Sequence, residues 1–249
     1  MTQVKTAQEI MNMRHAGKIL AEALNFLAGW IKPGIKTIEI DEKAREILSK
    51  YPGATAPFLG YQGFPATICV SVNDEVEHGI PGERVLNEGD IVGLDFGVAY
   101  KGMITDAGVT VGVGKISDEA QALIDSTKKS LHLGLKEVKG GVSVGDIGQT
   151  VQDFAEAKGY GVVRELVGHG VGYSLHEDPS IPNYGRRGSG PKLAAGMTVA
   201  IEPMLTTGDW RIKLDSDEWT FRTVDGSLAA HFEHTVLVTD KGCEILTQL

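Results

Sequence analysis

One stretch of this sequence decides the fold: Gly89-Asp-Ile-Val-Gly-Leu-Asp-Phe-Gly-Val-Ala-Tyr-Lys-Gly-Met-Ile-Thr-Asp-Ala-Gly-Val-Thr-Val111. Two runs rich in Val, Ile, Leu and Thr flank Ala99-Tyr-Lys-Gly102, a pattern that predicts a β-hairpin with a glycine-assisted turn. A turn centred in the middle of this tetrapeptide would place Asp95 directly opposite Asp106, with their Cβ atoms roughly 4.5–5.5 Å apart.

These two acids have two interpretations. Carboxylates at that distance repel each other, and a bare charge among apolar residues is costly, so a bound cation would relieve both effects. Alternatively, Asp95 and Asp106 are solvated residues on the surface of a twisted hairpin, and a register slip of one residue would separate them. The hairpin by itself leaves both a metal site and a solvated pair open.

The composition is that of a globular protein. The 249 residues contain 42% hydrophobic residues, enough for a full core, and 32 glycines, which indicate many tight turns. A net charge of -9 disfavours a nucleic-acid or anionic-membrane surface. No run approaches the roughly 20 apolar residues of a membrane span, and Cys69 and Cys243 offer no disulfide framework. We therefore expect a cytoplasmic protein without a signal peptide that binds neither nucleic acid nor membranes.

Helical patterns surround the strand patterns. Thr6-Ala-Gln-Glu9 is a capping box, and the helix that it begins should end before Pro33. Further helices are expected at residues 37–50, 117–140 and 144–158. Because no linker or low-complexity segment interrupts the chain, we expect a single catalytic domain over residues 1–249.

The second half of the chain repeats motifs of the first half in the same order. Gly89-x-x-Val-x-Leu-Asp95 matches Gly196-x-x-Val-x-Ile-Glu202; a His-Gly dipeptide precedes each motif, and an acid at the start of a further strand pattern follows each. The matched residues are His78 and His169, Asp95 and Glu202, and Asp106 and Glu233.

These matches predict a duplicated α+β fold with pseudo-two-fold halves, roughly residues 1–115 and 116–249, and a site on the pseudo-symmetry axis. The two acids are 11 residues apart in the first half and 31 residues apart in the second half. The second half should therefore contain an insertion, which we expect at residues 206–227.

The duplication brings four carboxylates and up to two histidines to one place. Acidic side chains are almost never fully buried without partners. Two divalent ions about 3.5–4 Å apart would neutralise them and form a hydrolytic dinuclear centre. An oxygen-rich donor set with one imidazole favours Mn, Fe(II) or Co over a thiolate-selected zinc ion.

The chain resembles the type I methionine aminopeptidases of bacteria, which have the pita-bread fold, over nearly its whole length. The segments that carry the resemblance are Ser71–Pro81, Asp95–Gly97, Thr105–Asp106, Gly168–Gly172, His176–Pro179, Ile181–Gly185, Ile201–Met204 and Phe232–Thr235. The resemblance implies an antiparallel sheet covered by helices on one face. It also implies a dinuclear-metal hydrolase that removes the initiator methionine from nascent proteins and peptides, with preference for a small second residue.

The resemblance further implies a role for each motif residue. Asp95 would chelate one ion, His169 and Glu202 would hold the other, and Asp106 and Glu233 would bridge both. A hydroxide between the ions would attack the scissile carbonyl. Glu202 would also accept and donate the proton.

Further motif residues would contact the substrate. His78 would face the peptide nitrogen, and His176 would stabilise the oxyanion. The methionine side chain would bind Tyr61, Phe64, Cys69 and Trp219. Aromatic faces and a thiol suit a flexible thioether, although buried cysteines and aromatics are also ordinary core residues.

The sequence departs from the family pattern at three positions. Gln62 stands where many bacterial members have a histidine, and Leu175 where an aromatic residue is common. His231, two residues before Glu233, is also unusual. It either points away from the site or makes a polar contact behind the metal ligands.

Two other functions remain open at this point. One is a Xaa-Pro aminopeptidase or prolidase-like hydrolase of the same fold, although those enzymes usually carry a further N-terminal domain. The other is a catalytically silent pita-bread module that binds a partner. For the aminopeptidase, the expected partners are peptide and protein N-termini, with the ribosome as a further candidate, and we expect a monomer.

Overall fold

The structure is a computed structural model that describes residues 4–248. Its helices are α1 (Ala7–Trp30), α2 (Thr37–Leu48), the short 3₁₀ helix η1 (Tyr61–Gly63), α3 (Asp118–Glu137) and α4 (Val144–Glu156). The strands of the first half are β1 (Ala54–Thr55), β2 (Ile68–Val72), β3 (Glu75–Glu77), β4 (Ile91–Tyr100) and β5 (Met103–Gly112). The strands that follow α4 are β6 (Gly161–Val162), β7 (Gly168–Gly170), β8 (Glu177–Ile181), β9 (Thr198–Ile201), β10 (Met204–Thr206), β11 (Ile212–Leu214), β12 (Phe221–Thr223), β13 (Ala229–His231), β14 (His234–Val238) and β15 (Cys243–Ile245).

The helices begin where their capping residues predict. The Thr6 hydroxyl accepts a hydrogen bond from the Glu9 amide, and the Glu9 carboxylate accepts one from the Thr6 amide, so the capping box is confirmed. Ser117 caps α3 in the same way by accepting from the Ala120 amide. The helix α1 ends at Trp30, before Pro33, as predicted.

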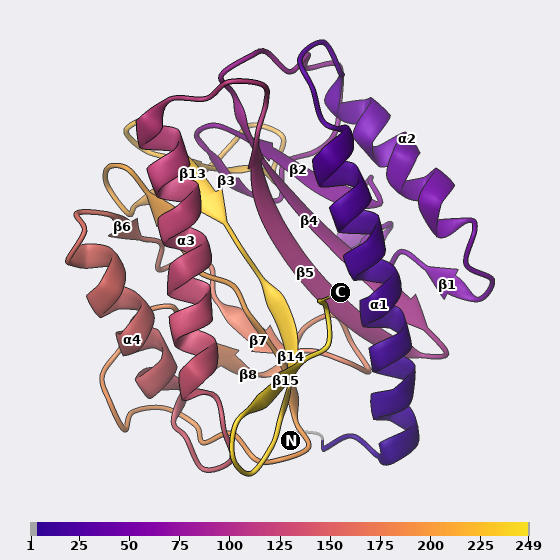
Figure 1. Cartoon of the computed structure of the whole chain (residues 1–249), viewed down its shortest axis with the longest axis vertical. Helices are drawn as coiled ribbons and strands as arrows, with labels where there is room; N and C mark the ends of the chain where they lie inside the picture. Colours follow the sequence, from indigo (N-terminus) through magenta and orange to yellow (C-terminus); the bar gives the residue numbers. More distant parts are fainter. Residues whose placement is uncertain (1–3, 249) are drawn as a thin grey trace.

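Each half of the chain packs two helices against a sheet. In the first half α1 and α2 cover β2 and β4, and in the second half α3 and α4 cover β9 and β14. Figure 1 is viewed from the helical side, with α1 and α3 running in front of the strands. The predicted α+β fold, with antiparallel strands covered by helices on one face, is confirmed. None of the helices in residues 4–248 is long and apolar enough to cross a membrane.

The predicted register of the central hairpin is wrong by two residues. Asp95 lies opposite Gly108, and Asp106 lies opposite Gly97, so the two acids are not directly opposed. Because side chains on a strand alternate with a period of two, this shift leaves both acids on the same face of the hairpin. Asp95 and Asp106 are therefore diagonal neighbours.

The turn explains the error. Lys101 and Gly102 form it, with φ of 48° and 77°, so its centre lies one residue later than predicted. A two-residue hairpin turn of this kind needs positive φ at both positions. The lysine accepts that conformation although glycine, asparagine or aspartate is usual there.

The strand β5 joins the two halves. Its Gly108 carbonyl accepts a hydrogen bond of 2.9 Å from the Glu233 amide. The Thr235 hydroxyl accepts from the Asp106 amide (2.9 Å) and donates to the Asp106 carbonyl (2.7 Å). Figure 1 shows β5 and β14 side by side at the centre of the molecule. The acids of both halves thus meet along one seam.

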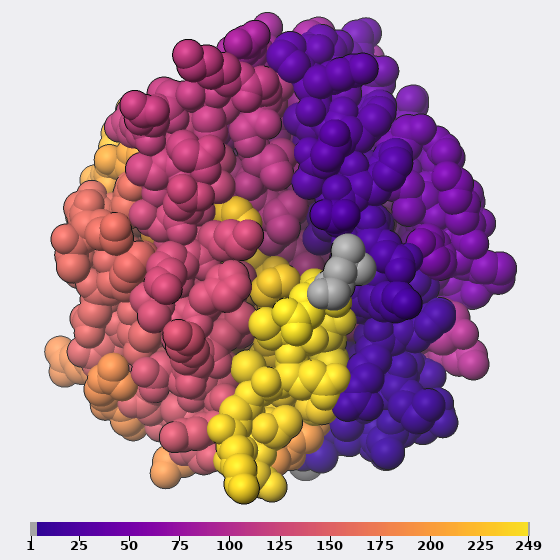
Figure 2. Space-filling model, in the orientation of Figure 1, coloured from indigo at the N-terminus to yellow at the C-terminus, as the bar shows by residue number. Residues whose placement is uncertain are grey.

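The C-terminal segment fills the space between the helices of the two halves. Glu244 pairs with Arg14 of α1 at 2.7 Å, and the Cys243 thiol lies 3.4 Å from the Leu135 carbonyl of α3. In Figure 2 this segment, in yellow, lies between the indigo surface of α1 and the magenta surface of α3.

The predicted insertion at residues 206–227 forms a further hairpin. Its strands β11 and β12 pair with each other, and β12 pairs with β3 through Phe221 and Glu77. This small sheet carries Trp219 to the edge of the cavity described below.

Candidate metal centre and substrate pocket

A cavity of about 260 Å³ opens where the two halves meet. Its polar wall consists of five carboxylates and four histidines: Glu77, Asp95, Asp106, Glu202, Glu233, His78, His169, His176 and His231. Its apolar wall includes Phe58, Tyr61, Phe64, Cys69, Leu175 and Trp219. Within the described part of the chain, neither lysine nor arginine lines this cavity.

The four predicted acids come from four strand positions along the seam. Asp95 lies in β4 and Asp106 in β5, whereas Glu202 directly follows β9 and Glu233 directly precedes β14. All four side chains are buried. The structure therefore brings together every acid that the duplication predicted.

Burial disfavours the ionised form of these acids when no cation is bound. It raises the pKa of Asp95 to about 7 and, together with the neighbouring carboxylates, raises the pKa of Asp106 and Glu233 well above the usual range. One oxygen each of Asp95, Asp106 and Glu233 is buried without a hydrogen-bond partner. Orphaned oxygens of this kind fit metal ligands, because a bound ion would satisfy them.

His169 lies in β7, and the orientation of its ring leaves Nε2 available as a metal ligand. Its Nδ1 lies 2.8 Å from the Gly170 carbonyl, which fixes the proton on Nδ1. Its Nε2 lies 3.4 Å from Glu202 Oε1. Burial, with a contribution from His176, lowers the pKa of His169 to about 3, so the ring is neutral at pH 7. Ligand atoms of His169, Asp106 and Glu233 lie within 4.8 Å of one another.

His176 is held by a hydrogen bond from Tyr61. The Tyr61 hydroxyl lies 2.8 Å from Nδ1 of His176, whose ring centroid is 4.3 Å from that of His169. Partial desolvation lowers the pKa of His176, which favours the neutral form of its ring. When Tyr61 donates to Nδ1, the proton of His176 resides on Nε2, which can then donate to a substrate.

His78 lies in a loop that is pressed against β2. The Gly79 amide donates to the Ser71 hydroxyl (3.2 Å), and a Cβ at Gly79 would lie 2.2 Å from the Val70 carbonyl oxygen. Only glycine allows that approach, which explains the His-Gly dipeptide. His78 itself has φ of 57°, a conformation that functional residues often adopt. Burial lowers its pKa to about 4.

The apolar wall contains the four residues that the resemblance assigned to methionine binding. Phe64 and Trp219 make an edge-on contact with ring centroids 5.1 Å apart. Cys69 lies opposite Asp95 in the pairing of β2 with β4, and burial raises the pKa of its thiol well above the usual range. The three departures from the family pattern also line the cavity: Gln62, Leu175 and His231.

The sequence matches a known metallopeptidase family and its members. Residues 11–240 match the model of metallopeptidase family M24. The chain belongs to this family. The M24 peptidase is 50% identical to a methionine aminopeptidase of Clostridium acetobutylicum, over 98% of both chains. It is 47% identical to methionine aminopeptidase 1 of Bacillus subtilis, again over 98% of both chains.

Solved structures separate two branches of related folds. A crystal structure of methionine aminopeptidase from Thermotoga maritima matches this M24 peptidase with a TM-score of 0.98 and 45% identity, over 100% of both chains. An Xaa-Pro dipeptidase from Bacillus anthracis matches with a TM-score of 0.80 and 25% identity, over 99% of this chain and 62% of that one. By both measures the M24 peptidase is more similar to the methionine aminopeptidase.

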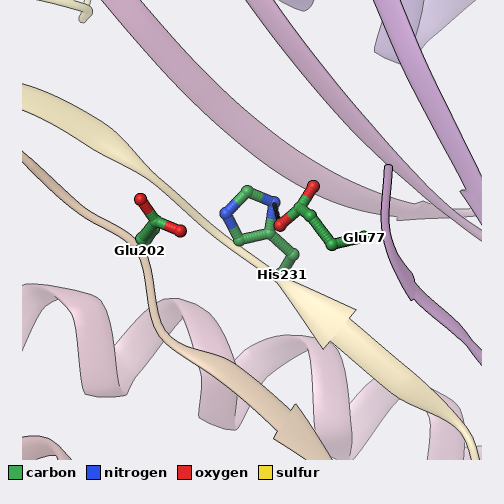
Figure 3. Close-up of side chains that lie close together, drawn as sticks. All are labelled: Glu77, Glu202 and His231. Carbon is green, nitrogen blue, oxygen red and sulfur yellow. Dashed lines mark ion pairs between the residues drawn. The ribbon is translucent and has the colours of Figure 1, made fainter. Parts of the chain in front are cut away.

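Two further residues of the M24 peptidase enter the cavity. His231 points into the site rather than away from it, with Nδ1 3.2 Å from Glu77 Oε2 (Figure 3). Gly108 makes room for the ring, because a Cβ there would lie 2.4 Å from its Cε1. Glu77 was not predicted as a site residue. An acid directly before the His78-Gly79 dipeptide was the signal that could have indicated it.

Proposed function

We propose that this M24 peptidase is a methionine aminopeptidase that hydrolyses the initiator methionine from nascent proteins and peptides with a small second residue. The observation that carries this proposal is the union of an apolar pocket and a buried carboxylate–histidine cluster in one cavity. The names of the most similar relatives support the same activity.

The cluster is suited to two divalent ions. Asp95, Asp106, His169, Glu202 and Glu233 would hold them, and the oxygen-rich donor set favours Mn, Fe(II) or Co. When bound, such ions lower the pKa of water and polarise a carbonyl group. The orphaned buried oxygens and the neutral His169 ring support this assignment.

Three residues of the chain would act on the peptide. The Glu202 carboxylate would take the proton from the attacking water and deliver it to the leaving amine. His176 would donate from Nε2 to the oxyanion, since Tyr61 occupies its Nδ1. His78 would contact the peptide nitrogen from the loop that directly follows β3.

The apolar wall would bind the methionine side chain. Phe64 and Trp219 offer aromatic edges and faces, and Cys69 offers a polarisable sulfur, all of which suit a thioether. Because this wall ends at the carboxylates, the first residue of a chain can place its free amine among acceptors. An internal residue has no such amine, which explains action at the N-terminus.

Nascent chains are the natural source of such N-termini. We expect the enzyme to act as a cytoplasmic monomer on chains that leave the ribosome. Sedimentation of the purified enzyme, with and without ribosomes, would test the monomer and the docking separately.

The activity is tested by methionine release from metal-stripped protein. Peptides of the Met-Gly-Met-Met type and peptides with proline in second position would be offered after Mn, Co, Fe(II) or Zn is added back. We expect metal-dependent release of methionine alone, which is lost in Glu202→Gln.

Other outcomes would point elsewhere. Release of residues other than methionine before proline would indicate an Xaa-Pro peptidase. A folded, metal-loaded protein that cleaves nothing would favour a silent binding module.

A further inference from the structure

The Glu77 and His231 side chains form a second cluster beside the proposed dinuclear centre. They come from β3 and β13, which belong to different sheets, and both are almost fully buried, with exposed fractions of 4% and 3%. The proposed mechanism assigns no role to either residue. A carboxylate and an imidazole buried together in this way require an explanation.

Their contact is not a hydrogen bond. His231 Nδ1 lies 3.2 Å from Glu77 Oε2, yet Glu77 Oε2 has no hydrogen-bond partner, and neither has His231 Nε2. Two neighbouring ligands of an octahedral ion with bonds of about 2.1 Å lie roughly 3 Å apart. The observed separation therefore fits two ligands of one ion.

Glu202 completes a set of three donors. One atom each from Glu77, His231 and Glu202 lies within 4.8 Å of the other two. Figure 3 shows the imidazole ring between the two carboxylates, so only one ring nitrogen would bind the ion, and the side chains would have to turn for all three residues to share it. Glu202 faces His169 with Oε1 at 3.4 Å, so it stands between the proposed centre and this cluster.

The charge of the cavity also calls for a further cation. Five carboxylates line it, and two divalent ions balance the charge of four. Lysine and arginine are absent from its described lining, so no cationic side chain there supplies the missing charge. The four acids of the duplicated motifs are the ones assigned to the two ions. Glu77 is therefore the carboxylate whose charge is left without a counter-ion.

We propose that Glu77, His231 and Glu202 bind a third divalent cation next to the proposed dinuclear centre, and the count of three rests on that centre. The donors are two carboxylates and one imidazole, so the site would take Mn(II), Fe(II) or Co(II) as readily as the proposed centre does. Gly108 belongs to this site indirectly, because its missing side chain leaves room for the His231 ring.

The test counts ions, so it does not depend on which peptide the enzyme cleaves. Stripped protein would be titrated with Mn(II) alone, and bound metal would be measured by calorimetry and by elemental analysis after gel filtration. We expect three ions per chain in the wild type, and two in Glu77→Gln and in His231→Gln.

His234→Gln is the matched control. His234 is half-buried and adjoins Glu233, but its Nδ1 lies 2.9 Å from the Thr247 hydroxyl, away from the cavity. This variant should keep three ions.

The proposal is overturned if the wild type and both site variants bind the same number of ions at saturating Mn(II). In that case Glu77 and His231 would only contact each other. A wild-type count of two that falls to one in both site variants would keep this site and revise the proposed dinuclear centre instead. Circular dichroism verifies that each variant is folded. If a variant does not fold, anomalous scattering from a Mn(II)-soaked wild-type crystal decides, by a third peak between Glu77 and His231 or its absence.

Discussion

Tyr61 shows how a residue that binds no metal can control the chemistry of this site. Its hydroxyl lies 2.8 Å from Nδ1 of His176 and can fix the proton of that ring on Nε2. Without this hydrogen bond the ring could carry its proton on either nitrogen and could rotate. The oxyanion donor would then be correctly placed for only part of the time.

We expect Tyr61→Phe to lower kcat for methionine release by about 5- to 10-fold, the equivalent of one neutral hydrogen bond. His176→Ala removes the donor itself and should lower kcat by about 10²–10³-fold. KM should change little in both variants, because the interaction is made in the transition state. Tyr51→Phe is the control, since Tyr51 bonds to Glu22 far from the cavity. Equal losses in Tyr51→Phe and Tyr61→Phe would contradict this role.

Trp219 forms one side of the proposed methionine pocket and comes from the hairpin inserted into the second half. Trp219→Ala removes its edge contact with Phe64 and should raise KM for methionyl peptides by about tenfold, with a smaller change in kcat. Steady-state kinetics on one peptide series measures both. Trp210→Ala is the control, because Trp210 packs on Arg164 outside the cavity. A loss confined to kcat would indicate that Trp219 does not bind the side chain.

At the scale of elements, the period of the strands was easier to predict than their register. The alternation in β4 and β5 placed Asp95 and Asp106 on one face, and a shift of two residues kept them there. The turn at Lys101 could not be predicted, because a lysine with positive φ is uncommon. Repeated motifs predicted the four acids because they are local, whereas Glu77 and His231 meet only through the pairing of distant strands.

Gly108 illustrates the same limit, since nothing in its neighbours in sequence indicates a histidine above it. Gly108→Ala would bring a Cβ to 2.4 Å from the His231 ring and should lower the free energy of unfolding by about 1–3 kcal/mol. In a His231→Ala background the same change should cost much less, which a double-mutant cycle from denaturant unfolding measures. Gly29→Ala in α1, where a Cβ meets nothing within 4 Å, should be neutral or stabilising. Additive effects of the first two changes would contradict the steric explanation.

At the scale of the whole molecule, the site is the seam between two halves that each supply only part of it. The Asp106–Thr235 hydrogen bonds and the Gly108–Glu233 bond hold the seam together beside the buried acids. Without metal, the fold must therefore bury several carboxylates at its centre. That cost is a property of the assembled molecule, and it depends on pH.

Metal-stripped protein should lose stability as the pH rises from 6.5 through about 7. Burial raises the pKa of Asp95 from 3.8 to about 7, so its contribution to stability is fully present below pH 3.8 and is lost as the pH rises through about 7. The other buried acids of the cavity shift in the same direction. Each proton that the folded state retains and the unfolded state has lost changes stability by about 1.4 kcal/mol per pH unit.

One buried and one half-buried histidine set the lower limit of this pH window. The pKa of His169 falls to about 3 and that of His234 to about 4, so their contributions are present above pH 6.5 and are lost as the pH falls toward those values. Above pH 6.5 the carboxylates therefore determine the slope. With Mn(II) bound, the acids must be ionised and the slope should reverse, because metal binding then releases protons. Guanidinium unfolding of stripped and loaded protein between pH 6.5 and 8.5 measures both slopes. A stripped protein with constant stability across this range would mean that the acids are already ionised in the absence of metal.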